Sequence, residues 1–210
     1  TPTSDLDLMI VTRRQEAPYR ASFRAYGWPI EAFVHTPESY RWYFRSDTGR
    51  RIPALATVCI EGIVLRDVDG LADRIRAEAR DLIAAGPPPL TDAEREDLRY
   101  ALTDVLDDLL GTMDRAEGLF IAHEVAEASA KLLLLINNHW IGRGKWLIRA
   151  LRRFDEQEAQ RLEAALAAYH RTEDKSGLVA FARSTLEQAG GPVFEGFYRS
   201  GQRSDELNRS

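Results

Sequence analysis

The chain has 210 residues, of which 44% are hydrophobic and 29% are charged, a composition typical of one or two folded domains and unlike that of a disordered or fibrous chain. Lys and Arg total 28 against 33 Asp and Glu, and the net charge of -5 argues against a broad cationic surface for duplex nucleic acid. The sequence has a single cysteine, Cys59, and therefore no intrachain disulfide. It contains no apolar run of the roughly 20 residues that a membrane span needs, and no signal-peptide pattern. These features predict a soluble, cytoplasmic protein.

Three short apolar segments before Asp69 predict β-strands, because they are rich in β-branched and aromatic residues and are separated by Pro, Gly and charged residues. They span residues 6–12, 28–35 and 56–65, and the third is interrupted at Gly62. The basic and aromatic segment 13–27 is predicted as a loop or an irregular excursion.

The hydrophobic period becomes helical after Asp69. Leu71 and Ile75 lie on one face of a predicted helix that stops at Gly86. The three prolines at positions 87–89 then form a stiff linker, which we take as the domain boundary.

About five amphipathic helices are predicted after this linker. Thr91 followed by Glu94 is the capping-box signature that begins the first of them. Helices over residues 91–113, 117–137, 144–154, from 155 onward and 175–189 are joined by short connections, as in an antiparallel bundle. The sequence therefore predicts an α+β fold, with a small mixed sheet and flanking helices over residues 1–86, a helical bundle over 90–199 and a polar tail over 200–210.

Two aspartates at the start of the first strand are the most informative feature. Asp5 and Asp7 stand in the segment SDLDL, although Asp is disfavoured in strands. Because side chains alternate, the two project from the same face with Cα atoms about 6.6 Å apart, and both carboxylates could bind the same divalent cations. The alternative is a pair of solvated acids, with Ser4 capping a turn.

Glu31 stands inside the second predicted strand, where an uncompensated carboxylate is costly. A cation shared with Asp5 and Asp7 would compensate it, and three hard oxygen ligands favour Mg²⁺ or Mn²⁺ over zinc. Glu61 is the alternative third ligand. Glu31 is preferred because Gly62, beside Glu61, indicates a bulge or a strand end.

An acidic pair in the form SDLDL, followed by a lone acid in IEAF on a later strand, resembles the polymerase-β-like nucleotidyltransferase superfamily. The resemblance is strongest to small bacterial members related to the kanamycin and streptomycin nucleotidyltransferases, whose catalytic domain is also followed by a helical bundle. It implies that Asp5 and Asp7 hold two Mg²⁺ ions, that Glu31 helps to activate the attacking hydroxyl, and that a nucleoside triphosphate is the co-substrate.

The same family places a Gly-Ser loop shortly upstream of the acidic pair, where it holds the nucleotide phosphates. The sequence begins at Thr1 without this loop and without an initiator methionine. We expect that the N-terminal strand and loop are missing from the sequence, the alternative being a degenerate member that binds triphosphates weakly.

A Gly-rich turn in the helical half could bind a phosphate. Arg143 and Lys145 open a helix there, and Trp146 could stack on a base or contact the acceptor. Together with Ser4, Arg143 and Lys145 are the predicted nucleotide contacts. The alternative is a helix-helix turn with a buried tryptophan anchor.

Glu124 and Glu127 lie along one edge of an apolar helix and are predicted to line an acceptor pocket, the alternative being a solvated helix face. The four histidines show no zinc-ligand spacing. Arg115 and His123 are too far apart for the Arg–His pair of a helical ribonuclease.

The sequence thus predicts an Mg²⁺-dependent enzyme that moves a nucleoside monophosphate, first of all AMP, to a hydroxyl of a small molecule such as an aminoglycoside-like compound. Two alternatives stay open: the same chemistry on a protein hydroxyl, as in antitoxin-like enzymes, and a non-catalytic nucleotide-binding regulator. A homodimer is left open, and neither a membrane nor duplex nucleic acid is expected as a partner.

Overall fold

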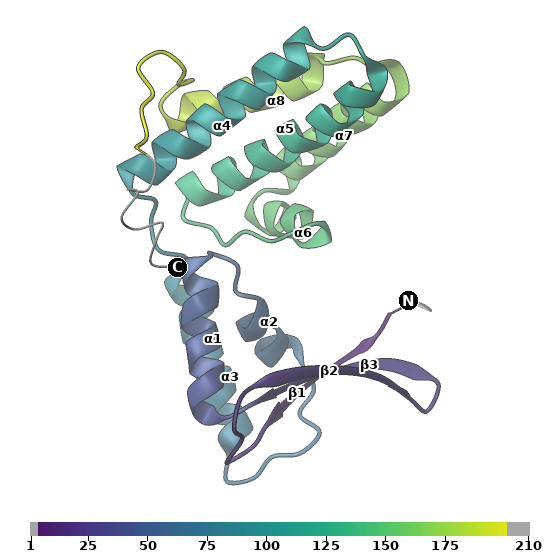
Figure 1. Cartoon of the computed structure of the whole chain (residues 1–210), viewed down its shortest axis with the longest axis vertical. Helices are drawn as coiled ribbons and strands as arrows, with labels where there is room; N and C mark the ends of the chain where they lie inside the picture. Colours follow the sequence, from purple (N-terminus) through teal and green to yellow (C-terminus); the bar gives the residue numbers. More distant parts are fainter. Residues whose placement is uncertain (1–3, 201–210) are drawn as a thin grey trace. The chain divides into compact units, whose positions relative to one another are not determined.

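The computed structural model describes residues 4–200, which fold as two units (Figure 1). The first unit runs to Pro88 and also contains Asn138–Trp146, and the second contains Pro89–Asn137 and the chain from Leu147 onward. The expected polar tail, apart from Ser200, lies outside the described residues. The three-stranded mixed sheet and the helical bundle confirm the predicted α+β fold.

The sheet of the first unit contains β1 (Leu6–Val11), β2 (Tyr19–Ala25) and β3 (Trp28–His35) in the order β1-β3-β2. β1 pairs with β3 in parallel, and β2 pairs with β3 in antiparallel orientation. The predictions of β1 and β3 are confirmed. β3 therefore lies in the centre and carries Glu31 between the two outer strands.

The prediction of a loop over residues 13–27 is wrong for its second half, which is β2. Apolar and polar side chains alternate along YRASFRA, and the arginines hide this period of two in a composition that looks like a loop. Tyr26 and Gly27, with φ of 52° and 80°, make the left-handed two-residue turn that suits the twist of a hairpin.

The third predicted strand is also wrong, because residues 54–61 form helix α2 (Ala54–Glu61). Its β-branched composition favours a strand, but Leu55 and Ala56 are buried among helices and the chain offers no further strand to pair with in the described residues. A helix before it, α1 (Pro37–Gly49), was not predicted. Its signal was present in the sequence as Thr36 and Ser39, which form a reciprocal capping box ahead of an aromatic stripe.

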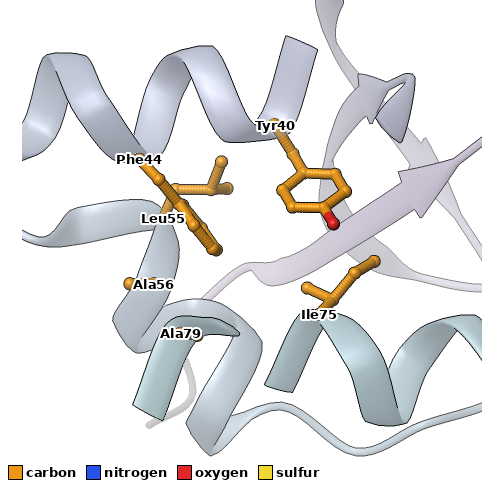
Figure 2. Close-up of a cluster of buried hydrophobic side chains, with 6 residues drawn as sticks. All are labelled: Tyr40, Phe44, Leu55, Ala56, Ile75 and Ala79. Atoms are coloured by element: carbon orange, nitrogen blue, oxygen red, sulfur yellow. The ribbon is translucent and has the colours of Figure 1, made fainter. Parts of the chain in front are cut away.

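The core of the first unit lies between α1, α2 and α3 (Leu71–Ala85), where six side chains are buried together (Figure 2). The members of this cluster are Tyr40, Phe44, Leu55, Ala56, Ile75 and Ala79. Met9 and Val11 of β1 pack against it from the sheet. The helices thereby hold the C-terminal half of β1 and leave its N-terminal half, with Asp7, exposed.

The second unit is a bundle of helices, and the predicted helices of this region are confirmed. They are α4 (Asp92–Gly111), α5 (Arg115–Ile136), α6 (Lys145–Phe154, whose first two residues belong to the first unit), α7 (Glu156–Thr172) and α8 (Ser176–Ala189). The capping box of Thr91 and Glu94 begins α4 as predicted. α5 packs against α4, α7 and α8, and ten of its residues are buried. Among the described residues, no helix has the length and apolarity to cross a membrane.

Candidate functional site

Three carboxylates meet at the N-terminal end of β1. Asp7 in β1 stands directly opposite Glu31 in β3, and Asp5 precedes β1 by one residue. One oxygen of each of Asp5, Asp7 and Glu31 lies within 4.8 Å of the others. Two neighbouring strands thus bring Glu31 to a pair of acids that lie more than 20 residues before it in the sequence.

The alternation of side chains along the strands explains this convergence. Asp7, Met9 and Val11 share one face of β1. Asp7 is exposed to the solvent, whereas Met9 and Val11 on the same face pack against the helical core. Packing of Met9 and Val11 therefore fixes the side on which Asp7 lies, since a slip of one residue would move the acid to the opposite, apolar face of the sheet.

The acids disfavour one another's charge. Desolvation raises the pKa of Asp7, and the charges of Asp5 and Glu31 raise it further, whereas the positive charges of Arg20 and Lys145 lower it. No hydrogen bond or ion pair within the described residues involves the side chains of Asp5 or Asp7. The pair is therefore poised to bind a cation.

Arg20 of β2 is the neighbour that the sequence analysis missed. Its Nη2 donates to both carboxylate oxygens of Glu31, at 2.5 Å each, and its guanidinium lies over the ring of Phe33 at 5.2 Å from the centroid. These bonds to Glu31 raise the pKa of Arg20. The loop predicted for its segment gives Arg20 no neighbour, because only the register of β2 on β3 places it beside Glu31.

The donor set fits a divalent cation of the magnesium class. All three groups are hard carboxylate oxygens, two of them are exposed and one is half-buried, and no thiolate or imidazole is among them. Asp5 and Asp7 are directly accessible as ligands. Glu31 is neutralised by Arg20, so a cation must share or replace the guanidinium to reach it.

Glu61, the alternative third ligand, is the last residue of α2 and is not among the three grouped acids. The structure therefore brings Glu31, and not Glu61, to the aspartates. Ser4 precedes Asp5 directly and is exposed.

The predicted phosphate turn is divided between a loop and the start of α6. Lys145 is the first residue of α6, lies 5.8 Å from the ring centroid of Trp146 and contributes to the field at Asp7. Arg143 is exposed, and its carbonyl accepts a bond from the Trp146 backbone N–H at 3.0 Å. Gly142 lies so close to Trp146 that a Cβ would stand 2.5 Å from its backbone, which explains the glycine.

The two predicted acceptor residues on α5 belong to the second unit. Glu127 pairs with Lys131 at 2.5 Å and lies 3.8 Å from His123, while Glu124 is exposed. These contacts are those of a charged helix face within the second unit.

A cavity of about 620 Å³ begins at Asp7 and runs along β1 towards the segment between α2 and α3. Its walls are mostly apolar and include Met9, Val58, Leu65 and Ile75, with Arg66 and Arg76 as positive groups. Its volume is in the range of small-molecule sites.

Comparison with known proteins adds little to this geometry. No protein-family model matches the sequence, and no curated protein matches it. Among solved structures, the chain is similar to a nucleotidyltransferase-like protein from Exiguobacterium sibiricum, with 11% sequence identity and a TM-score of 0.43. The alignment covers 88% of this chain and 63% of that one, so the chain spans less than two thirds of its length.

Proposed function

We propose that the protein is a divalent-metal-dependent nucleotidyltransferase that moves a nucleoside monophosphate, AMP in the first instance, from a triphosphate to a hydroxyl of a small molecule. The observation that carries this proposal is the convergence of Asp5, Asp7 and Glu31 within 4.8 Å. Residues 1–86 would form the catalytic domain, residues 90–199 the bundle, and the cytoplasm would be the site of action.

Asp5 and Asp7 would hold the metal, as two Mg²⁺ ions or Mn²⁺, with Glu31 as the third ligand. When bound, the metal would neutralise the polyanionic triphosphate and stabilise the negative charge of the departing pyrophosphate. The acids of this chain would determine where the positive charge of the metal lies, because the packing of β1 fixes the position of Asp7.

The reaction forms a bond between the acceptor oxygen and the α-phosphorus and breaks the bond between that phosphorus and the pyrophosphate oxygen, which leaves with the electron pair. The acceptor's proton would pass to Glu31, a contribution of typically ~10² to 10⁴ in rate. Arg20 would have to release Glu31 for this step, since its guanidinium donates to both carboxylate oxygens of Glu31.

Ser4, Arg143 and Lys145 would contact the phosphates. Lys145 has the best support of the three, because its charge already acts on Asp7. Glu124, Glu127 and Trp146 would contact the acceptor, which we propose to be an aminoglycoside-like compound. The cavity beside Asp7 offers space for the apolar part of a substrate.

The test is release of pyrophosphate from a panel of triphosphates with Mg²⁺ and candidate acceptors. We expect Asp7→Asn to lower the rate by at least about a hundredfold, because the charge that binds the metal is lost while the size is kept. Asp104→Asn, at an exposed position of α4, is the matched control. Unchanged, metal-dependent release in Asp7→Asn would contradict the proposal.

A second candidate is a non-catalytic nucleotide-binding regulator, which the pairing of Arg20 with Glu31 favours because it occupies the proposed base. Such a protein would bind triphosphate with Mg²⁺ in calorimetry and release no pyrophosphate. Transfer to a protein hydroxyl would appear instead as label from the α-phosphate on a protein substrate.

A further inference from the structure

One face of the sheet carries only apolar side chains. The pairing registers of β1, β2 and β3 assign eleven residues to this face, which we call the open sheet face. They are Leu6, Leu8, Ile10, Tyr19, Ala21, Phe23, Ala25, Trp28, Ile30, Ala32 and Val34. The acids, Arg20 and Ser22 all belong to the opposite face, so the charges of the sheet are segregated completely.

The helices of the first unit do not cover this face. α1, α2 and α3 lie together on one side of the strands (Figure 1). Met9 and Val11, which pack against the core of these helices, alternate with the residues of the open sheet face and point to the other side. Ala32 and Val34 are buried because they lie in the central strand between the side chains of the two outer strands.

The outer residues of the face remain strongly exposed. Their side chains are 42% to 51% accessible, for Leu6, Ile10, Tyr19, Phe23 and Trp28. With about 200 Å² for a large side chain, these five residues expose roughly 450 Å² of contiguous, largely apolar surface, which on a protein surface marks an interaction site.

We propose that the open sheet face is the interface through which two copies of this chain form a two-fold dimer. A two-fold interface requires a surface that is complementary to itself. An uncharged face meets this condition, because no side chain on it would face a like charge on the copy. The opposite face, with its three acids and its arginines, does not meet it.

The exposed area agrees with a weak dimer. Two copies would bury roughly 900 Å² from these side chains and more from their half-buried neighbours, which is near the lower limit of about 1,000 Å² for specific interfaces. The two sheets would pack about 10 Å apart as a β-sandwich, with the aromatic rings of β2 and β3 between them. Weak, transient complexes have interfaces at this low end of the size range, so we expect a dissociation constant of the order of micromolar.

The test is the mass of the full chain in sedimentation velocity between about 1 and 200 μM, a span that brackets the expected constant. The wild-type chain is expected to change from monomer to dimer across this range. Phe23→Glu and Tyr19→Lys should each shift the midpoint at least tenfold upwards, because each buries a charge at the interface. Phe120→Glu places the same charge at an 82% exposed aromatic residue of α5 and should leave the midpoint unchanged.

Hydrogen exchange of the wild-type chain gives a readout that needs no variant. Amides of β2 should exchange more slowly at the high concentration, and those of the bundle should not. A chain that stays monomeric over the whole range overturns the proposal, as do a dimer that survives Phe23→Glu and Tyr19→Lys and growth into unlimited aggregates. If another part of this chain or a different protein covers the open sheet face instead, the chain stays monomeric over the whole range. The proposed transferase is tested separately, since none of these variants touches the acids.

Discussion

Tyr40 donates a hydrogen bond from its buried hydroxyl to Glu78 Oε2 at 3.0 Å, and Arg41 holds the same carboxylate from the solvent side. Burial raises the pKa of Tyr40 to about 12, and the bond to Glu78 adds to this effect. Because the folded protein keeps the proton that the unfolded chain loses near pH 10, the stability from this group is complete below pH 10 and is lost as the pH rises to about 12.

We therefore expect the free energy of unfolding of the first unit to fall between about pH 10 and pH 12, and Tyr40→Phe to remove part of this fall. Denaturant titrations at a series of pH values measure it. Tyr26→Phe is the control, because Tyr26 is fully exposed. An identical alkaline fall in wild type and Tyr40→Phe would disprove the assignment.

Arg20 and a metal ion compete for the same carboxylate. The guanidinium holds both oxygens of Glu31, so its removal should tighten Mg²⁺ binding by several-fold, the effect of one nearby unit charge at partial solvent exposure. We expect this result for Arg20→Met in calorimetric titration with Mg²⁺. Arg24→Met, four residues away on the same face of β2, controls for the loss of a positive charge alone. Equal affinities in wild type and Arg20→Met would show that Glu31 is not a ligand.

At the scale of elements, α5 and α7 approach closely at Gly118. A Cβ there would stand 2.0 Å from the buried hydroxyl of Tyr169. Alanine in a helix normally stabilises by up to about 1 kcal/mol over glycine, but here overpacking of about 1 to 3 kcal/mol outweighs that gain. We expect Gly118→Ala to lower the free energy of unfolding of the bundle.

The double variant Gly118→Ala, Tyr169→Phe should recover most of the loss, because the clashing oxygen is gone. Gly111→Ala, at a helix end where a Cβ meets nothing within 4 Å, should change the stability by less than about 0.5 kcal/mol. Chemical denaturation of the three variants measures these changes in the free energy of unfolding. A stabilised Gly118→Ala would contradict the close approach.

Local patterns predicted those elements whose period is strong and whose ends carry their own signals. The helices of the bundle are of this kind, with Thr91 and Asp155 as side-chain caps. α2 could not be predicted, because its β-branched sequence is overridden by burial between α1 and α3.

The three acids of the site could be predicted from the sequence, but their neighbour Arg20 could not. The spacing of Asp5 and Asp7 is a local property of one strand, and Glu31 was inferred from the cost of a carboxylate in an apolar segment. Arg20 depends on a long-range property, the register that places Ser22 opposite Glu31. No spacing within the sequence contains that register.

At the scale of the whole molecule, the segment Asn138–Trp146 belongs to the first unit although it follows α5 in the chain. Trp140 Nε1 donates to the carbonyl of Ile83 at 3.0 Å, and the Ile141 backbone N–H donates to the carbonyl of Arg51 at 3.0 Å. These two hydrogen bonds therefore connect this segment to α3 and to the chain just after α1.

We expect Trp140→Phe to destabilise the first unit by about 1 kcal/mol, because the Ile83 carbonyl loses one of its two donors, the other being the Gly86 backbone N–H. Trp42→Phe, at a 55% exposed position of α1, is the matched control and should have a much smaller effect. Hydrogen exchange of the α3 amides reports on the first unit directly. Faster exchange in Trp42→Phe than in Trp140→Phe would contradict the role of the returning segment.

The return of Asn138–Trp146 also bears on biosynthesis. The first unit ends its main stretch at Pro88, but its last hydrogen-bonding segment emerges from the ribosome only after α4 and α5, the first two helices of the bundle, have been translated. At a translation rate of about 5 to 20 residues per second, several seconds pass between synthesis of the sheet with its three helices and synthesis of Trp140 and Ile141. During that interval the nascent chain presents an incomplete α3 surface, which is where we expect chaperones to bind.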